Sequence, residues 1–245
     1  MISGFYSAAT AMESSMRRHE VASENLANSQ MPGFRQRMVF NEEFQKQLGH
    51  QSSGSAGSAA SMLGTSIGPI VFNFEQGPLQ NTSKPLDLAL NGEGFFTVQG
   101  PEGPLFTRNG SFYIDQNRQL TTIDMLPVMG TNGPIVLPEN VTAESVTVSN
   151  EGHLIGGGRE FGQLALVDFP DKTGLSGEGA SLFSADPDTK QSPARAQVLQ
   201  GHLELSNTSS IDEMITLIEC TRHIDAAQKA MQTLSESVQK RIGLR

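Results

Sequence analysis

The pattern of apolar positions divides the chain into two helical ends and a middle of short strands. Between Gly201 and Gly243 the sequence contains no glycine or proline, the residues that most often interrupt a helix. Ser210, with Glu213 three residues later, has the spacing of a capping box, and Gly243 is a typical stop. The spacing therefore predicts one long helix from Ser210 to Ile242.

Apolar residues follow this helix at alternating steps of three and four, the spacing of a coiled-coil seam. The seam consists of Leu217, Cys220, Ile224, Ala227, Met231, Leu234 and Val238. Four more apolar residues widen its face at the start of the helix: Ile211, Met214, Ile215 and Ile218. Such a helix spans about 45 Å, more than the roughly 35 Å diameter of a 100-residue domain. We expect it either to cross the molecule as a core helix or to project from it as a coiled-coil partner.

The N-terminal end repeats this pattern. No breaker occurs between Gly4 and Pro32-Gly33, and the residues that step by three and four are Ile2, Phe5, Ala9, Met12, Met16, His19, Ser23 and Leu26. Neither helix can hide its apolar stripe alone, and pairing with the other would cover both. The two ends are therefore predicted to lie side by side, with the rest of the chain looped out between them.

The middle of the chain changes character twice. Residues 50–66 are dominated by Ser, Gly and Ala, a composition typical of a flexible loop. From Ile67 onwards apolar residues alternate with a period of two, and turn sequences recur at Asn91-Gly92, Gly100–Gly103 and Asp115–Arg118. This recurrence of short alternating segments and turns predicts an antiparallel β-sandwich or barrel.

The predicted fold class is α+β, with long N- and C-terminal helices paired as a coiled coil and a central all-β antiparallel domain looped out between them. The expected segments are an N-terminal helical segment over residues 1–48, a flexible loop over 49–66 and a β domain over 67–200. A C-terminal helical segment over 201–245 is expected to pack against residues 1–48.

Charge and hydropathy exclude several classes of partner. The formal charge is −9 and no basic stripe is present, which argues against binding to nucleic acid or to an anionic membrane surface. No run approaches eighteen apolar residues, so we expect no membrane insertion. The N-terminal residues lack the basic region and apolar run of a cleaved signal peptide. Cys220, the single cysteine, is expected to be a small buried hydrophobe on the seam.

No catalytic constellation is present in the sequence. Gly92-Glu93-Gly94 leads into a strand and not into a helix, and Gly156–Arg159 lacks the Lys-Ser/Thr of a phosphate loop. The five histidines lack metal-ligand spacing. Loop acids such as Asp168 and Asp171 could bind calcium, but such residues are usually only solvated. The chain is therefore predicted not to be an enzyme and to need no cofactor or metal.

Three segments, in order, resemble the bacterial flagellar basal-body rod and hook protein family. Asn25–Arg35 is similar to the N-terminal signature of the family, although Gln30-Met31 replaces its usual Thr-containing step. Leu86–Phe96, followed by Phe106–Phe112, resembles the central strand motif, and Gly201–Asn207 resembles the C-terminal signature. The residues that carry the N-terminal signature are Asn25, Leu26, Ala27, Asn28, Gly33 and Phe34.

The resemblance implies a structural subunit that polymerises through its terminal helices into a helical tube, the flagellar rod, which transmits torque. Its implied partners are copies of itself, other flagellar rod and hook proteins and the flagellar type III export apparatus. The implied location is the periplasm-spanning rod, reached without a cleaved signal peptide. The residues expected at the assembly interface are Ile2, Phe5, Ala9, Met12, Met16, Leu26, Ile211, Met214, Leu217, Ile218, Ile224, Ala227, Met231, Leu234 and Val238.

Two points stay open at this level. Phe40 and Phe44 resemble the hydrophobic export motif of such subunits, but their spacing is equally that of an ordinary i, i+4 pair on a helix. Phe72–Leu79 and the stretch from Pro127 to Pro138 favour the family member at the junction of the proximal and distal rod. The alternative to a rod subunit is an oligomeric β-sandwich that binds a ligand, such as a carbohydrate, on a helical stalk.

Overall fold

The computed structural model describes residues 2–41 and 67–242, which form two compact units. The helix unit takes its described residues from 1–27, 37–73 and 209–245, and the β unit consists of residues 28–36 and 74–208. These bounds differ from the predicted segments, because residues 28–36 belong with the strands and residues 67–73 with the helices. The predicted loop at 49–66 lies outside the described residues.

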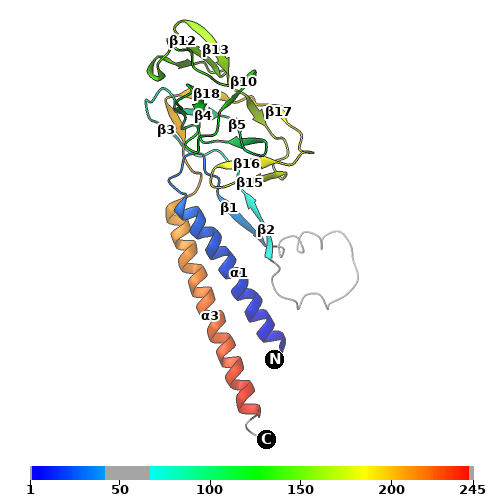
Figure 1. Ribbon diagram of the computed structural model, residues 1–245. Helices are drawn as coiled ribbons and strands as arrows, with labels where there is room; N and C mark the ends of the chain where they lie inside the picture. Colours follow the sequence, from blue (N-terminus) through cyan, green and yellow to red (C-terminus); the bar gives the residue numbers. More distant parts are fainter. Residues whose placement is uncertain (1, 42–66, 243–245) are drawn as a thin grey trace. The chain divides into compact units, whose positions relative to one another are not determined.

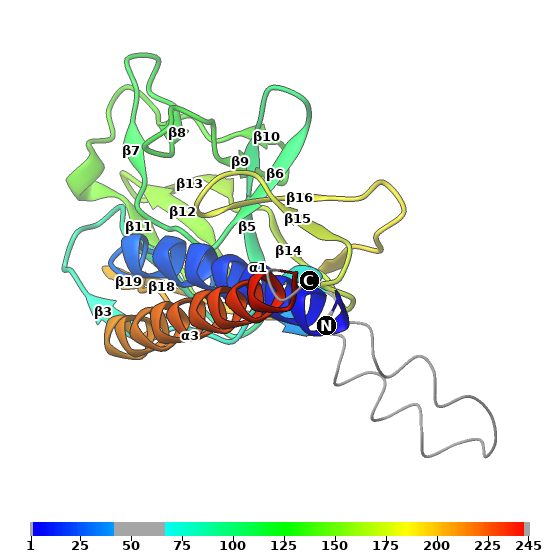
Figure 2. The same ribbon diagram turned by 90° about the horizontal axis from the view of Figure 1, so that it is seen from below.

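The helix unit is built on two antiparallel helices, α1 (Ile2–Ala27) and α3 (Ser210–Ile242), which lie side by side (Figures 1 and 2). Near one end of the pair, the Asn25 amide donates to the Glu213 carboxylate at 3.1 Å. Near the other end, a Cβ added to Gly4 would lie 3.7 Å from Leu234 Cδ1. Asn25 and Gly4 are as far apart in α1 as Glu213 and Leu234 are in α3, so one antiparallel register runs through the pair. The prediction of paired terminal helices flanking an antiparallel β domain is confirmed.

The limits predicted for α3 are confirmed, but the cap at its start differs. The Ser209 hydroxyl, and not that of Ser210, accepts a hydrogen bond from the Asp212 N–H at 3.4 Å. The carboxylate of Glu213, the other residue of the predicted capping box, accepts a hydrogen bond from Asn25 of α1. The residue that was predicted to serve the local cap therefore serves the contact between the helices.

The predicted seam of α3 agrees with the burial of its side chains. Cys220 is buried, and burial raises the pKa of its thiol. The other described members of the seam are half-buried, whereas most residues between them are exposed; these members are Leu217, Ile224, Ala227, Met231 and Leu234. The side chain of Val238 lies outside the described residues.

The seam predicted for α1 as the pairing surface is wrong. Of its described members, Ala9, Met16 and Ser23 are exposed, and Met12, His19 and Leu26 are only half-buried. The buried side chains in the described part of α1 are instead Ser14, Val21, Ala22 and Asn25. At 3.6 residues per turn, this buried set lies on nearly the opposite side of the helix from the predicted stripe. Gly4 and Asn25, which meet α3, share the buried side. The apolar stripe of α1 is therefore not its most buried side.

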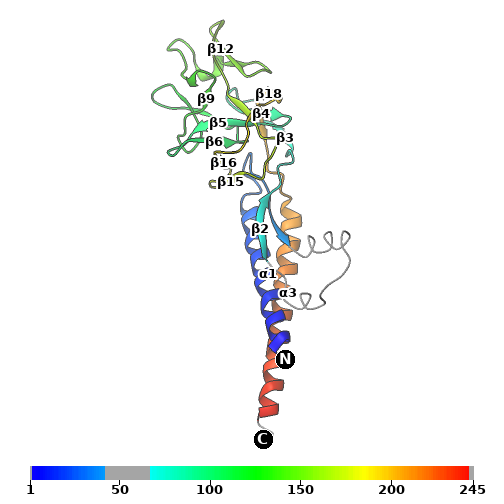
Figure 3. The same cartoon turned by 90° about the vertical axis from the view of Figure 1, so that its right-hand side faces the viewer.

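A two-stranded hairpin completes the helix unit, formed by β1 (Arg37–Asn41) and β2 (Ile67–Phe72) beside the helices (Figure 3). This pairing corrects the expectation of a helical segment through residue 48. The Arg37 backbone exchanges two hydrogen bonds with the Asn25 side chain, at 2.8 and 2.9 Å, and the Arg37 guanidinium lies over the Phe72 ring. These contacts fasten the hairpin to the end of α1.

The β unit contains six antiparallel sheets within its described residues. The largest runs in the order β15 (Leu175–Gly177), β16 (Leu182–Ala185), β6 (Pro104–Thr107), β5 (Phe95–Gln99), β14 (Leu166–Asp168) and β17 (Ser192–Pro193). A three-stranded sheet consists of β11 (Thr147–Val148), β12 (His153–Gly156) and β13 (Arg159–Gln163), and the 3₁₀ helix η2 (Ala143–Ser145) precedes it. The strand pairs are β18 (Gln197–Gln200) with β4 (Leu88–Asn91), β19 (His202–Glu204) with β3 (Leu79–Asn81), β7 (Tyr113–Ile114) with β8 (Leu120–Thr121), and β9 (Met129–Gly130) with β10 (Gly133–Pro134).

The predicted strands are present, but their pairing is less regular than that of a sandwich of two large sheets. The turns at Gly100–Gly103 and Asp115–Arg118 do connect paired neighbours, β5 with β6 and β7 with β8. The turn at Asn91-Gly92 does not, because β4 pairs with β18 from the far end of the unit. This long-range pairing draws the C-terminal signature next to the central motif.

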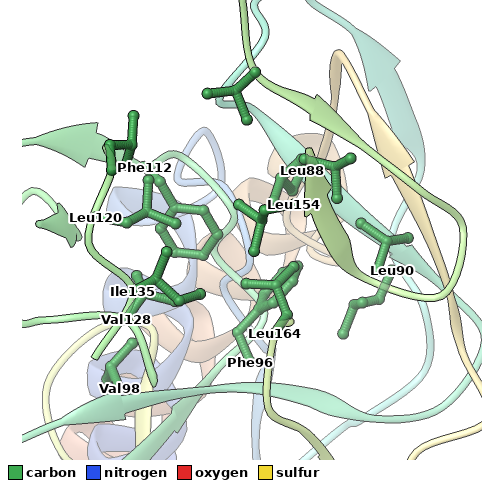
Figure 4. Packing of buried hydrophobic residues seen from close by; sticks show 14 of the residues in the cluster. Leu88, Leu90, Phe96, Val98, Phe112, Leu120, Val128, Ile135, Leu154 and Leu164 are labelled. Carbon is green, nitrogen blue, oxygen red and sulfur yellow. The ribbon is translucent and has the colours of Figure 1, made fainter. Parts of the chain in front are cut away.

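One hydrophobic cluster joins several sheets of the β unit, and a second group of buried rings, Phe95, Phe106, Phe169 and Phe183, packs outside it. Figure 4 shows side chains from several sheets pointing toward one another, among them Leu88, Phe96, Phe112, Leu154 and Leu164. All five are at most 3% exposed, and the Phe96 and Phe112 rings meet edge to face with centroids 5.2 Å apart. Because alternate residues of each short strand point inward, the sheets enclose a common core without forming a regular sandwich.

Candidate assembly interface and signature cluster

The segments that carry the family resemblance in the β unit meet at one buried carboxylate, that of Glu204 at the end of β19. This side chain is fully buried and accepts hydrogen bonds from Arg35 Nη2 at 2.5 Å, Arg108 Nη1 at 3.1 Å and the Gly77 N–H at 2.9 Å. Arg35 comes from the N-terminal signature, Arg108 from the central motif and Glu204 from the C-terminal signature. We call these three side chains the signature cluster.

The backbone around the signature cluster is equally constrained. The Glu204 carbonyl oxygen accepts a hydrogen bond from the Gly33 N–H at 2.8 Å. Gly33 has φ of 71°, and a Cβ at this position would lie 2.2 Å from the backbone nitrogen of Asn109. A side chain there would therefore meet both backbone strain and a steric clash. Phe34, the next residue of the signature, is buried.

Electrostatics explain why the three side chains depend on one another. Burial lowers the pKa of Arg108, whereas the Glu204 carboxylate opposes that shift. Arg108 also donates to the Gly92 carbonyl at 2.8 Å and lies over the Phe95 ring at 5.4 Å. Buried charges are tolerated when they are paired and hydrogen-bonded, and removing one partner leaves the others uncompensated. The cluster therefore fixes three distant segments of the β unit in one arrangement.

The first signature residue, Asn25, has a similar role in the helix unit. Its buried side chain bonds both backbone groups of Arg37 and the Glu213 carboxylate. Leu26 and Asn28 are half-buried and Ala27 is exposed. The signature residues thus mainly stabilise the fold, and the sequence alone did not predict which residues of the chain they bond. The available signal was the single Arg or Glu in two short signature segments, Arg108 in Phe106–Phe112 and Glu204 in Gly201–Asn207.

The strongest surface feature of the helix unit is an apolar face at the start of α3. Ile211 is 71% exposed, and Met214, Ile215 and Ile218 are 51–55% exposed. Their spacing of i, i+3, i+4 and i+7 places them on one side of α3, nearly opposite the seam that meets α1. The prediction that they widen the face of that seam is therefore wrong. We call these four residues the α3 apolar face. The same side carries Arg222, Asp225 and Lys229 in later turns, so the apolar part ends after two turns.

The N-terminal residues predicted at an interface are only partly described. Met16 is 53% exposed and Ala9 is also exposed, whereas Met12 and Leu26 are half-buried. The side chains of Ile2 and Phe5 lie outside the described residues, as does the side chain of Phe40. The whole of Phe44 is also outside them, so the predicted export motif stays a prediction.

Other chemistry in the described part of the chain is local. The Asp171 carboxylate accepts hydrogen bonds from the N–H and the hydroxyl of Thr173, which lower its pKa. Among residues 2–41 and 67–242, no cluster of three acidic, His or Cys side chains is arranged to hold a metal. The helices within those ranges also lack a segment long and apolar enough to cross a membrane. The helix pair has an exposed apolar face, and the distant segments of the β unit are held together by buried charges. This is the architecture of a structural assembly protein.

Comparison with known proteins gives the family. Residues 89–156 match the D1 domain of the flagellar hook protein FlgE/F/G, and residues 199–244 match the C-terminal region of the flagellar basal body rod FlgEFG protein. The chain is 31% identical to the flagellar basal-body rod protein FlgG of Borreliella burgdorferi, with 95% of both chains covered. It is 30% identical to the flagellar basal-body rod protein FlgF of Caulobacter vibrioides, with 93% of this chain and 92% of the relative covered. The chain belongs to the flagellar basal-body rod protein family, whose members are structural proteins and not enzymes.

Proposed function

We propose that this chain is a structural subunit of the flagellar basal-body rod and that it joins copies of itself through its terminal helices. The observation that carries the proposal is the exposure of the α3 apolar face, Ile211, Met214, Ile215 and Ile218. These four side chains are exposed although α3 already pairs with α1. Family membership supplies the setting, since the matched relatives are named as rod proteins.

Burial of this face provides a driving force for association. Fully burying one large apolar side chain contributes about 1.5–3 kcal/mol. Because the four side chains are 51–71% exposed, covering them would contribute roughly 3–7 kcal/mol before the cost of association. A contact between different surfaces of two copies leaves a free surface at each end. Such a contact generates a helical filament when the rotation does not close.

The remaining features of the proposal follow from the family. Neighbouring rod and hook proteins are the proposed partners, in keeping with a relative named flagellar hook-basal body complex protein FlhO, from Bacillus subtilis, which is 27% identical. The proposed location is the periplasm-spanning part of the rod. Passage through the flagellar export apparatus without a cleaved signal peptide is part of the same proposal. The alternative, a ligand-binding module on a stalk, is not favoured by any of the names of the relatives reported above.

Charge placed on the α3 apolar face tests the proposal. A double variant, Ile215→Glu with Ile218→Glu, puts two carboxylates into the face without touching the seam. A matched control, Gln228→Glu with Gln232→Glu, adds the same charge at exposed positions further along α3. We expect the first variant to stay monomeric by sedimentation velocity, to form no filaments by electron microscopy and to lose motility in a complemented deletion strain.

The control should associate and support motility as the unchanged chain does. Circular dichroism of both variants checks that the helices are retained, since both pairs of positions are exposed. If the Ile215/Ile218 variant assembles normally, or if the control is impaired to the same extent, the α3 apolar face does not carry the contact.

A further inference from the structure

Charge is divided unequally between the two units. The β unit contains sixteen Asp and Glu residues against eight Lys and Arg residues, a formal charge of −8. The helix unit contains ten acidic residues against nine basic ones, a formal charge of −1. Nearly all of the net charge of −9 is therefore carried by the unit that lacks the α3 apolar face.

The imbalance at the surface of the β unit is sharper than its composition suggests. Arg35 and Arg108 are buried and form ion pairs with Glu204, so they add no positive charge to the surface. Arg118 donates to three backbone carbonyls, those of Leu137, Pro138 and Val141. Twelve acidic side chains of the β unit are exposed, whereas its exposed cations are Lys84, Arg159, Lys190 and Arg195.

We propose that the acidic surface of the β unit opposes association between copies, so that ionic strength controls the contact made by the helices. The inference rests on the proposed function, which supplies that contact. Net charge far from zero keeps a protein monomeric through mutual repulsion. The two units therefore have opposite effects on association. The helix unit, nearly neutral and apolar on one face, attracts a second copy of the chain at short range. The acidic β unit repels the β unit of that copy at longer range.

The direction of the salt dependence distinguishes this arrangement from others. Salt screens repulsion over about 30 Å at 0.01 M and about 10 Å at 0.1 M. For two charges of −8 held about 30 Å apart, Coulomb's law with this screening gives an association constant that rises roughly tenfold to a hundredfold over that range. Assembly that depended on ion pairs between copies would instead weaken as salt is added.

The test uses the full chain and a variant with a less acidic β unit. Four exposed acids with no hydrogen bond or ion pair among the described residues are neutralised: Glu102→Gln, Asp124→Asn, Glu139→Gln and Glu144→Gln. This halves the charge of the β unit, so the repulsion between two copies falls to about a quarter. The control exchanges four exposed neutral residues of the same unit: Gln80→Ser, Gln116→Ser, Asn132→Ser and Gln191→Ser.

Sedimentation velocity in 0.01–0.3 M sodium chloride gives the association constant of each protein. We expect the unchanged chain and the control to associate more strongly as salt rises, with the hundredfold upper limit shrinking to about threefold in the acid-neutralised variant. Comparing the three proteins separates charge screening from general salting-out, which acts on all of them. Association that is unaffected or weakened by salt, or an equal salt response in all three proteins, would overturn this inference alone. Absence of association by every protein at every salt concentration would overturn the proposed function, and this inference with it.

Discussion

Removing the negative charge of the signature cluster should destabilise the β unit strongly. Glu204→Gln keeps the shape of the side chain but replaces one carboxylate oxygen, either Oε1 that accepts from Arg35 or Oε2 that accepts from Arg108, with an NH₂ group that cannot accept a hydrogen bond. Arg35 and Arg108 would then lose the carboxylate that bonds them both, at 2.5 and 3.1 Å, and the more weakly acting Asp168 would offset only part of the Arg108 charge. Breaking a buried ion pair by removing one partner typically costs about 3–5 kcal/mol.

That loss would be a large fraction of the stability of a domain, which is usually about 5–15 kcal/mol. Since the chain has two units, a single unfolding midpoint would mix their contributions. Hydrogen exchange followed by mass spectrometry reports each unit separately, because the slowest amides of peptides from residues 74–208 measure the unfolding free energy of the β unit. Glu139→Gln, which neutralises an exposed acid of the same unit, serves as the control and should change this free energy by less than about 0.5 kcal/mol.

A double-mutant cycle isolates the interaction between the charges. Arg35→Met in the Glu204→Gln background removes one of the two buried arginines that have lost the Glu204 carboxylate. The combined loss should therefore be smaller than the sum of the two single losses by about 1–3 kcal/mol. A loss below about 1 kcal/mol for Glu204→Gln, or strictly additive losses in the cycle, would refute the reasoning that the buried carboxylate holds the two arginines in place.

Three further outcomes are expected. Asn25→Ala removes three hydrogen bonds and should lower the unfolding free energy of the helix unit by about 2–3 kcal/mol in hydrogen exchange; unchanged protection would contradict its role. Gly33→Ala should cost more than about 3 kcal/mol because of its clash, whereas Gly158→Ala, at φ of 79° with open space around it, should cost about 1 kcal/mol in the same assay. The hydrogen bond to Glu160, at 2.7 Å, raises the pKa of half-buried His153. Any stabilisation from this pair is therefore present below the ordinary His pKa and is lost as pH rises through the raised pKa. An NMR titration should show the His153 pKa falling in Glu160→Gln; an unchanged pKa would exclude Glu160 as the cause.

Local sequence was sufficient for the elements whose causes are local. The absence of glycine and proline between Gly201 and Gly243 placed α3 at its observed limits, and its apolar period identified the side that meets α1. Alternation and turn residues located most strands and the hairpins at Gly100–Gly103 and Asp115–Arg118. These features depend on backbone sterics and on the period of the side chains, which neighbouring residues determine together.

Tertiary structure decided which face of α1 packs and where the charged signature residues go. A 3.6-residue period shows that α1 has an apolar stripe, but the folded structure buries the side with Ser14 and Ala22 and leaves Met16 exposed. Glu204 lies 169 residues from Arg35 and 96 from Arg108, so their pairing leaves no local pattern in the chain. The sequence by itself determined the two long helices and most strands of the β unit. The folded structure alone decided the β1–β2 hairpin, the packing of α1 and the meeting of three signatures at one carboxylate, because pairing and burial depend on residues brought together from distant parts of the chain.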